Sequence, residues 1–570
     1  MKYGAQIIVD TLEQLGVTIV FGMPGTQNVG LYDALRSSRL RTVVSSNEMA
    51  ASFAANGYYR ASGKVGVLTT IPGPGFTYAL SGLAEAQLDS AALLHITSTT
   101  GDGSSRKFQH QYLDMAAIAA PLVKKVITVT EIEKLADAVV EGFRLTTEGE
   151  PGPVLLLFDK SLYQQFADTA ASIQLRASTS PDPTALELIA KRVSSASKLV
   201  IFAGQGCQDS PKQLKLLADA TKAIVMTTNS GRGAIPESDP RSLYYDYSSG
   251  GGDTVNELID ACDLVLAIGC KFSHNGSGGF RLKIPKERFI QVDSSDGTLN
   301  SNYPASISLV ALADKFLEGL LPLVKLPPES VGWDSNDIAS WRSRIREEQF
   351  NRLRNVPQVM TPVPVSLEKF FAALQSTLPQ DACLVTDSGF HQVLTRAFST
   401  IQVPRGLITP ADFQSMGFSI PAAIGARASS PHRTIVAIIG DGGMAISGME
   451  LLTAVREKLD LKIVVFNDGY LNLIRMQQLQ GGLKESAVGL VNPDFALLAS
   501  SIGANYFALT EDLSGSLAAF VNSSGVSILE LFVSDGPGID RLKLKGTLKR
   551  QVRAVVSPTM FQWLKRKIRG

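Results

Sequence analysis

Two short acidic motifs carry the residues best suited to hold a metal ion. Gly440–Gly443 (Gly-Asp-Gly-Gly) and Asn467–Gly469 (Asn-Asp-Gly) each follow a run of apolar, mostly β-branched residues. The Asp441 carboxylate, the Asn467 amide oxygen and a nearby backbone carbonyl are hard oxygen ligands of the kind that Mg²⁺ prefers. The glycines leave backbone N–H groups free for phosphate oxygens. These residues predict a metal and diphosphate site, although Gly-Asp-Gly alone suits an ordinary turn equally well.

Two predicted strands place both motifs on one edge of a sheet. The continuous apolar runs at Ile435–Ile439 and Ile463–Phe466 are typical of buried parallel strands. Ligands of open α/β sheets bind at the carboxyl ends of such strands, where Asp441 and Asn467 stand. Between the strands we expect a helix whose buried face consists of Met449, Leu452, Val455 and Leu459.

A second group of motifs lies near the N-terminus. Ser46–Ala51 (Ser-Asn-Glu-Met-Ala-Ala) follows the apolar strand Thr42–Val44 and opens a predicted helix. An acid in the first turn of a helix is favoured by the helix dipole, and Glu48 taken alone is explained in that way. The motif is flanked by three further glycine-containing stretches: Phe21–Gly25, Gly57–Lys64 and Gly73–Gly75.

The order and spacing of these motifs resemble the thiamine diphosphate-dependent enzymes, in particular the large catalytic subunits of the acetolactate synthase group, over roughly residues 1–535. The resemblance implies that Asp441, Asn467 and the carbonyl of Gly469 hold Mg²⁺. It implies that Glu48 touches N1′ of the cofactor's aminopyrimidine and promotes its imino tautomer. The family usually carries Asn-Asn where this chain has Phe466-Asn467, so the ligating second Asn is retained.

Smaller matches imply further contacts with the cofactor. Asp387–Gln392 is similar to the Gly-x-His-Gln segment in which the His, here His391, reaches the diphosphate. Gln414–Ala426 resembles the stretch whose apolar side chain, here Met416, wedges between the two rings of the cofactor. A satisfied loop histidine and a plain core methionine are the alternatives. The other cofactor contacts that the resemblance implies are Gly25, Pro74, Gly442, Gly443 and Tyr470.

The expected substrate residues depart from the family. The Phe108-Gln109 pair resembles acetolactate synthases, but His110 replaces their following Glu. Met476 stands where those enzymes carry a Trp, and Leu473 stands where pyruvate decarboxylases carry a Glu. Simple decarboxylation of pyruvate is therefore disfavoured, and synthesis of branched-chain acetolactates is in doubt.

The resemblance implies decarboxylation of a 2-oxo acid with transfer of the acyl unit to an acceptor. A 2-hydroxyacyl-CoA lyase or oxalyl-CoA decarboxylase acting on an acyl-CoA, a flavin oxidase, and a non-catalytic paralogue are the alternatives. The family builds its site between the first segment of one subunit and the third segment of another. A homodimer or homotetramer with shared active sites is therefore implied.

The chain is expected to form three doubly wound parallel-sheet α/β domains. They are a pyrimidine-binding domain (1–165), a central domain (185–325) and a diphosphate- and Mg²⁺-binding domain (365–535). A polar stretch at 161–183 and prolines at 327, 328, 357, 362 and 364 mark the linkers. Gly204–Gly206 follows a central strand like a nucleotide-binding turn, but the third glycine of the fingerprint is missing. Whether FAD or ADP binds there stays open.

Composition excludes several classes of protein. No apolar run reaches the roughly 18 residues of a membrane span. The first residues enter an amphipathic helix (Ile8, Leu12, Leu15) without the pattern of a signal peptide. The four cysteines show neither CxxC nor zinc spacing, which fits a reducing cytoplasm. No motif indicates binding to nucleic acid.

The C-terminal tail has a charge of its own. Residues 541–570 contain ten lysines and arginines and no acid, against a net charge of +1 for the whole chain. Phe561, Trp563 and Leu564 among these bases suit a basic amphipathic helix. A tail that is solvated or packed on the protein is the simplest reading. A lid over an anionic substrate and a contact with a membrane surface are the functional alternatives.

Overall fold

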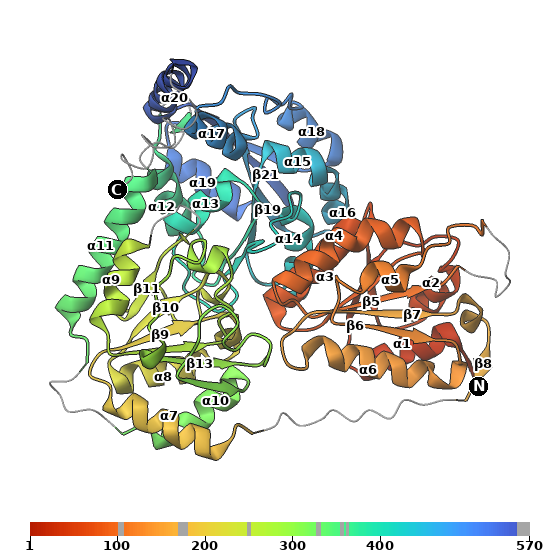
Figure 1. Cartoon of the computed structure of the whole chain (residues 1–570). Helices are drawn as coiled ribbons and strands as arrows, with labels where there is room; N and C mark the ends of the chain where they lie inside the picture. The colour runs from red at the N-terminus through yellow and green to blue at the C-terminus, as the bar shows by residue number, and fades with distance from the viewer. Residues whose placement is uncertain are drawn as a thin grey trace.

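The computed structural model describes residues 1–100, 108–168, 180–247, 252–325, 332–353, 358–360 and 364–555. Three sheets with flanking helices follow one another along the chain, all parallel except for one antiparallel edge strand in the last, and they confirm the predicted fold class (Figure 1). Prolines 327, 328, 357 and 362, residues 169–179 of the polar stretch and the aromatic end of the tail lie outside the described residues. Among the helices described, none has the length and apolar content needed to cross a membrane.

The N-terminal sheet has six parallel strands, and β5 and β7 lie fully buried within it. Its strands, in spatial order, are β3 (Arg41–Val44), β2 (Ile19–Gly22), β4 (Gly66–Thr69), β5 (Leu93–Ser98), β7 (Pro153–Phe158) and β6 (Lys125–Val129). Its helices are α1 (Gly4–Gln14), α2 (Val29–Arg36), α3 (Glu48–Ser62), α4 (Pro74–Leu88), α5 (Met115–Ala119) and α6 (Leu135–Thr147). A short antiparallel pair, β1 (Lys2–Tyr3) and β8 (Phe166–Ala167), joins the two ends of this region.

The central sheet is also six-stranded and parallel. Its strands, in spatial order, are β11 (Ser242–Tyr244), β10 (Ile224–Thr227), β9 (Leu199–Ala203), β12 (Leu264–Ile268), β13 (Phe289–Asp293) and β14 (Ile307–Val310). Its helices are α7 (Pro183–Ser195), α8 (Pro211–Thr221), α9 (Asp253–Ala261), α10 (Ala313–Leu320) and α11 (Ser335–Leu353). A methyl group at Gly204 would lie 1.8 Å from the carbonyl oxygen of Gly269, so close approach of two backbones explains this glycine.

The C-terminal sheet carries the predicted metal motifs. Its strands are β15 (Gln358–Met360), β21 (Val526–Ser534), β19 (Leu461–Asn467), β18 (Ile435–Gly440), β16 (Cys383–Thr386), β17 (Leu407–Ile408) and, beside β21, β20 (Asn505–Ala508). Its helices are α12 (Leu367–Thr377), α13 (Phe390–Phe398), α14 (Ser419–Ser429), α15 (Asp441–Ser447), α16 (Leu451–Arg456), α17 (Asn472–Gly481), α18 (Phe495–Ile502) and α19 (Leu513–Asn522). The two predicted strands are β18 and β19, and they pair in parallel as neighbours.

The helix expected between β18 and β19 is interrupted. A 3₁₀ turn, η9 (Gly448–Glu450), separates α15 from α16 and shifts the phase of the buried face. The predicted burial of Met449 and Leu452 is wrong, because these side chains are 56% and 41% exposed. Leu451 and Ala454 are buried in their place.

Close packing of α3 against α14 joins the N-terminal and C-terminal domains (Figure 1). A methyl group at Gly57 would lie 2.1 Å from the carbonyl oxygen of Ala422, and one at Gly425 would lie 1.8 Å from that of Ala54. Only glycine lets the two backbones approach so closely. Apolar side chains of both domains therefore share one core, which fixes the positions of the predicted motifs relative to each other.

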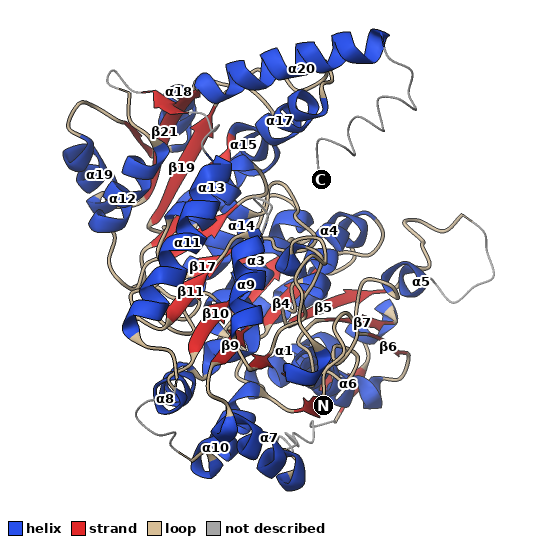
Figure 2. Cartoon of the chain, turned by 60° about the vertical axis from the view of Figure 1, so that its left-hand side comes forward, coloured by secondary structure: helices blue, strands red, loops and turns tan. Residues whose placement is uncertain are grey.

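The described half of the basic tail belongs to one long helix, α20 (Pro537–Val555). This helix lies along α17, the helix that follows the Asn467 motif (Figure 2). Lys549 Nζ donates to the carbonyl oxygen of Gln480 (2.6 Å), and Arg550 Nη1 donates to that of Leu483 (3.0 Å). This part of the tail is thus packed on the C-terminal domain.

Candidate active site

The three predicted metal ligands lie together at the carboxyl ends of β18 and β19. Asp441 begins α15 and is only 3% exposed. Its Oδ2 accepts a hydrogen bond from the backbone N–H of Gly469 at 2.7 Å. Asn467 ends β19, and its Nδ2 donates to Glu530 Oε1 at 2.6 Å. That bond fixes the Asn467 amide with Oδ1 on the side of Asp441.

A residue that the sequence did not single out completes this cluster. Asn492 Nδ2 donates to both Asp441 Oδ2 and Asn467 Oδ1, each at 2.8 Å. Two residues earlier, the backbone N–H of Leu490 donates to the carbonyl oxygen of Gly469 at 2.8 Å. Residues 488–492 therefore lie across all three predicted ligands. No sequence signal marked Asn492, because it stands in a loop that is brought to the site only by tertiary folding.

The donor set suits a hard divalent cation. Carboxylate, amide and carbonyl oxygens converge, and Gly469 has a φ of +70° with open space around its Cα. Asp468 is a second acid beside these ligands. Burial and the neighbouring charge of Asp441 raise its pKa to about 7. We call Asp441, Asn467, Gly469 and Asn492 the metal cluster.

His391 lies next to the first metal motif. It is the second residue of α13, and burial lowers its pKa to about 3, so the ring is neutral. Its Nε2 is buried and has no hydrogen-bond partner among the described residues. Methyl groups at Gly389 and Gly440 would lie 2.7 and 2.9 Å from the ring, so both glycines make room for it. A buried ring nitrogen without a protein partner among the described residues fits a ligand as its hydrogen-bond partner.

The loop that carries Met416 is positioned by Asp387. This acid belongs to the Asp387–Gln392 motif, but the sequence indicated no role for it. The buried Asp387 carboxylate accepts hydrogen bonds from the backbone N–H groups of Gly417 and Ser419, both at 2.9 Å. Burial raises the pKa of Asp387 to about 7. Met416 itself is exposed, and its Cε would lie 3.2 Å from a methyl group at Gly442. The signal available for Asp387 was its place directly after the buried strand β16.

Gly443 belongs to the same surroundings. A methyl group there would lie 3.1 Å from the Asp387 carboxylate and 2.9 Å from Ile439. His391, Met416, Gly442 and Gly443 thus all come from the C-terminal domain and lie at or beside the Gly440–Gly443 motif.

Glu48 lies in a separate cluster at the start of α3. Asn47 caps the helix by accepting from the backbone N–H of Ala50 at 2.8 Å. Glu48 is 6% exposed, and its carboxylate accepts no hydrogen bond among the described residues. A methyl group at Gly75 would lie 2.6 Å from Glu48 Oε1. Glycine at position 75 thus makes room for the carboxylate, and a nearly buried carboxylate without a partner among the described residues fits a ligand that supplies its hydrogen-bond partner.

Ile71 connects the other predicted residues to this Glu48 cluster. Methyl groups at Gly25 and Gly75 would each lie 2.7 Å from the Ile71 side chain. Pro74 is the first residue of α4, between Gly73 and Gly75. Gly25, Glu48 and Pro74 are therefore brought together, and all three come from the N-terminal domain.

The two clusters stand at opposite ends of one segment. Asp441 begins α15, whereas Glu450 at the end of η9 accepts from Ser46 N (3.0 Å) and Asn47 Nδ2 (3.4 Å). Burial raises the pKa of Glu450. The start of the Glu48 helix thus contacts the far end of the α15–η9 segment, away from Asp441.

The predicted substrate residues are divided between the clusters. Phe108 is fully exposed, Gln109 is half-buried and His110 is exposed. They precede Gln111, whose carbonyl oxygen would lie 2.7 Å from a methyl group at Gly73, beside Pro74. Leu473 and Met476 lie half-buried on α17 against the C-terminal core. Tyr470 is exposed beneath Arg475, whose guanidinium carbon lies 4.0 Å from the centre of the ring.

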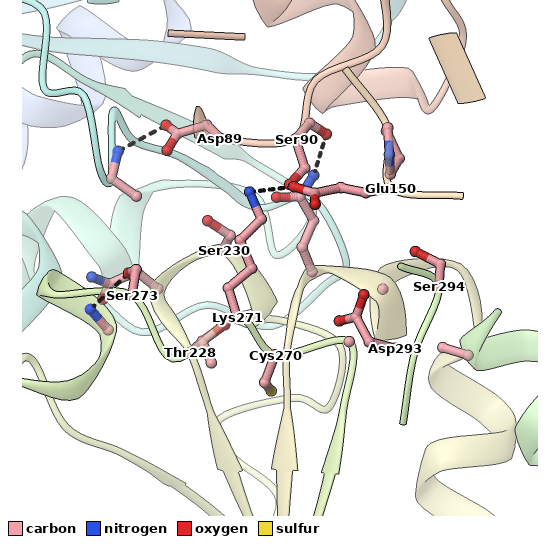
Figure 3. Close-up of a pocket in the computed structure, with 18 of the residues that line it drawn as sticks. Asp89, Ser90, Glu150, Thr228, Ser230, Cys270, Lys271, Ser273, Asp293 and Ser294 are labelled. Atoms are coloured by element: carbon pink, nitrogen blue, oxygen red, sulfur yellow. Dashed lines mark hydrogen bonds and ion pairs between the residues drawn. The ribbon is translucent and has the colours of Figure 1, made fainter. Parts of the chain in front are cut away.

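A cavity of about 360 Å³ lies where the central domain meets the other two (Figure 3). Loops after β9, β10, β12 and β13 line it, including the Gln205-Gly206 turn. Six carboxylates line it against two basic side chains, Lys271 and Arg405. Lys271 is ion-paired with Glu150, and Arg405 with Asp209. The lining is therefore acidic, and both of its cations are already paired.

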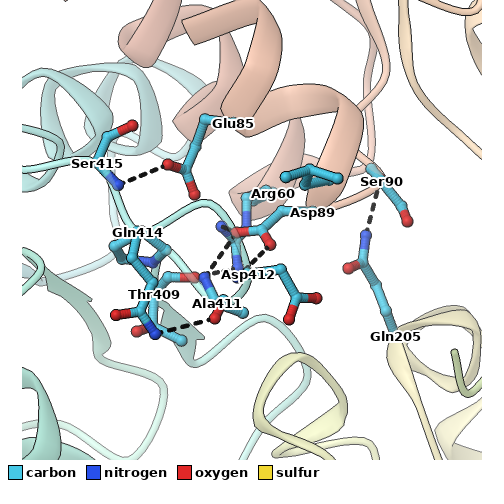
Figure 4. Close-up of polar contacts among 12 residues, drawn as sticks. Arg60, Glu85, Asp89, Ser90, Gln205, Thr409, Ala411, Asp412, Gln414 and Ser415 are labelled. Carbon is cyan, nitrogen blue, oxygen red and sulfur yellow. Dashed lines mark hydrogen bonds and ion pairs between the residues drawn. The ribbon is translucent and has the colours of Figure 1, made fainter. Parts of the chain in front are cut away.

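A buried acidic junction holds the loop before Met416 against the N-terminal domain (Figure 4). The Asp89 carboxylate accepts from the backbone N–H groups of Ala411 (2.8 Å) and Asp412 (3.0 Å), and from Arg60 Nη1 (3.2 Å). Glu85 Oε2 accepts from the backbone N–H of Ser415 at 2.9 Å. Burial and the neighbouring Asp89 raise the pKa of Glu85 to about 9, so this side chain is neutral at pH 7.

Three family models match the chain in order. The N-terminal TPP binding domain of thiamine pyrophosphate enzymes matches residues 2–118, their central domain matches 186–320, and their C-terminal TPP binding domain matches 387–531. The two clusters described above thus belong to regions that match the two TPP binding domains.

Three similar proteins carry related names. The chain is 30% identical to the acetolactate synthase isozyme 2 large subunit of Escherichia coli K12, over 93% of this chain and 96% of that protein. It is 28% identical to the probable acetolactate synthase large subunit of Methanocaldococcus jannaschii, over 97% and 95%. It is 29% identical to the chloroplastic acetolactate synthase 1 of Oryza sativa subsp. japonica, over 83% and 74%.

Proposed function

The chain belongs to the thiamine pyrophosphate enzymes of the acetolactate synthase-like group, and we propose that it decarboxylates a 2-oxo acid and transfers the acyl unit to an acceptor. The observation that carries this proposal is the pair of clusters. One offers a nearly buried carboxylate with no partner among the described residues, and the other offers convergent hard oxygen ligands. Glu48 and the proposed metal ligands Asp441, Asn467 and Gly469 are all retained, which argues against a non-catalytic paralogue.

Each cluster has a distinct task in the proposed site. Thiamine diphosphate, when bound, supplies the electron sink that decarboxylation of a 2-oxo acid requires. Glu48 would hold the aminopyrimidine and exchange a proton at its carboxyl oxygens. Asp441, Asn467 and the Gly469 carbonyl would hold Mg²⁺, and His391 would reach the diphosphate. Glu48 lies in the region predicted as 1–165, and the metal ligands lie in the region predicted as 365–535. Met416, also in 365–535, would wedge between the two rings of the cofactor.

We propose that the active site forms between two copies of the chain. Within one chain, the α15–η9 segment separates the Glu48 cluster from the metal cluster. Ile446 and Met449 on this segment, and Leu452 just after it on α16, are large apolar side chains, and all are exposed. Exposed apolar side chains beside a divided site support a homodimer, or a tetramer of such dimers.

A lyase acting on an acyl-CoA is the second candidate, and α20 favours it. This helix places Arg541, Lys545 and Lys549 in the C-terminal region beside α17, which carries Leu473 and Met476. An anionic substrate would be attracted by these charges. A contact of the tail with an anionic membrane surface would use the same charges.

We expect the purified protein to carry neither FAD nor ADP. The central cavity has room for a nucleotide, but its acidic lining and paired cations disfavour a diphosphate group. An absorbance spectrum and mass spectrometry of released small molecules test this expectation. A flavin band or a released adenine nucleotide would contradict it.

We assign the protein to the cytoplasm on the state of its thiols. All four cysteines are buried free thiols, and none of them forms a disulfide. Free thiols are typical of a reducing compartment. Fractionation of the native host would test this assignment.

The proposed reaction is tested by supplying thiamine diphosphate, Mg²⁺ and a panel of 2-oxo acids. We expect release of CO₂ together with a new carbon–carbon bond in the product. The same assay with 2-hydroxyacyl-CoA and oxalyl-CoA distinguishes the second candidate from the first. A lyase or decarboxylase breaks a carbon–carbon bond of these thioesters without a second carbonyl compound as acceptor. Failure of thiamine diphosphate to bind in the presence of Mg²⁺ would overturn both candidates.

A further inference from the structure

The side chain of Asn492 occupies a special position among the predicted metal ligands. Its Nδ2 lies 2.8 Å from Asp441 Oδ2 and 2.8 Å from Asn467 Oδ1. In an octahedral Mg²⁺ shell with bonds of about 2.0–2.1 Å, neighbouring ligand atoms stand roughly 2.8–3.0 Å apart. The position of Nδ2 therefore has the spacing that a third ligand atom would have beside these two oxygens.

The amide of Asn492 is free to turn, whereas that of Asn467 is not. Asn467 Nδ2 is bound to Glu530, which is itself held by the hydroxyl of Tyr506 at 2.7 Å. Asn492 Oδ1 has no hydrogen-bond partner among the described residues. A half-turn about Cβ–Cγ would exchange Oδ1 for Nδ2 and break no bond except the two to Asp441 and Asn467. A cation at the site would favour this turn, because it attracts the oxygen end of the amide and repels the N–H end.

The backbone holds Asn492 in place for this role. On one side, Leu490 N donates to Gly469 O, and Leu471 N donates to Val488 O, both at 2.8 Å. On the other side, Asp494 caps α18 by accepting from the backbone N–H groups of Ala496 and Leu497 at 2.9 Å. The Gly469 carbonyl has a second lone pair, so its bond to Leu490 leaves it able to bind metal.

We propose that Asn492 is a further protein ligand of the metal, binding it through Oδ1 after a half-turn of the amide. The proposal rests on the metal and diphosphate site of the proposed function. It adds a side-chain oxygen to Asp441, Asn467 and the Gly469 carbonyl, in a position that water would otherwise fill.

The test uses Mn²⁺ as the probe, with thiamine diphosphate and the full-length protein. Broadening of the Mn²⁺ EPR lines in ¹⁷O-water counts the water molecules bound to the metal, and titration of the free Mn²⁺ signal gives its affinity. For Asn492→Ala we expect one additional bound water and an affinity lower by at least about tenfold. Asn492→Asp keeps an oxygen at this position, so we expect the wild-type water count.

Asn505→Ala is the matched control, because Asn505 is an exposed asparagine on β20 in the same domain. It should match the wild type in water count and affinity. The proposal is overturned if Asn492→Ala also matches the wild type, or if Asn492→Asp gains a water as Asn492→Ala does. If the wild type itself binds no Mn²⁺ with thiamine diphosphate, the metal site of the proposed function fails, and this inference fails with it.

Discussion

The metal cluster and the Glu48 cluster differ in how far the protein itself satisfies their acids. Asp441 accepts hydrogen bonds from the backbone N–H groups of Gly442 and Gly469 and from the Asn492 amide. Glu48 accepts none among the described residues, although it too is nearly buried. The first carboxylate is organised before any ligand arrives, whereas the second gains its partner from the ligand. We therefore expect substitutions in the two clusters to impair different properties of the protein.

The largest expected effect is on turnover in Glu48→Gln. The substitution removes the group that exchanges a proton but keeps its size, and general acid–base groups typically contribute about 10²–10⁴-fold. We expect the rate of CO₂ release to fall by about that factor. The affinity for thiamine diphosphate with Mg²⁺, measured by fluorescence titration, should change little.

Glu141→Gln is the control for this prediction, because Glu141 is exposed on α6 of the same domain. It should keep the wild-type rate. A Glu48→Gln enzyme with near wild-type turnover would show that the carboxylate has no part in proton exchange.

Asp441→Ala should act on binding and on stability together. It removes a metal ligand, so we expect the affinity for the cofactor with Mg²⁺ to fall by at least about tenfold. It also leaves buried N–H donors without an acceptor, which costs about 1–3 kcal/mol in the free energy of unfolding. Titration calorimetry and urea unfolding measure the two effects separately.

The control for this variant is Asp381→Ala, because Asp381 is an exposed aspartate of the same domain. It should change neither quantity. If Asp441→Ala retained wild-type affinity for the cofactor, the contrast between the two clusters would be lost.

The third prediction concerns the junction that holds the loop before Met416, and the effect depends on pH. Because the folded-state pKa of Glu85 is raised to about 9 from the ordinary value near 4.5, the folded protein holds a proton that the unfolded chain releases between these values. Stability from the neutral carboxyl is present below about pH 4.5 and is lost as the pH rises toward 9. We expect the free energy of unfolding to fall, relative to Glu85→Gln, by at most about 1.4 kcal/mol per pH unit.

Thermal or urea unfolding of both proteins between pH 5 and pH 8 checks this prediction. Glu85→Gln is neutral at every pH and should show the flatter profile. Parallel profiles would mean that Glu85 titrates in the folded protein as it does in the unfolded chain.

The sequence predicted those parts of the site that depend on local patterns. Apolar runs ending in glycine or asparagine identified β18 and β19, and their shared edge follows from parallel pairing. The predicted buried face of the helix between them was wrong at Met449 and Leu452. A 3₁₀ turn changes which side chains face the core, and the spacing of apolar residues does not reveal such a turn.

Residues whose role depends on a distant partner could not be predicted. Asn492 reaches Asp441 and Asn467 from a loop, and Glu450 reaches Ser46 across two domains. The Glu450 contact depends on the packing of α3 on α14, which in turn rests on two glycines that look ordinary in the sequence.

The central claim is that the Glu48 cluster of one subunit and the metal cluster of another make one active site. Mixing the inactive Glu48→Gln and Asp441→Ala proteins under conditions that exchange subunits tests it most directly. A hybrid dimer would contain one site in which both clusters are intact, so random exchange should restore about a quarter of wild-type CO₂ release. Hybrids that form but remain inactive would contradict the claim, because a site built within one chain cannot be repaired by its partner.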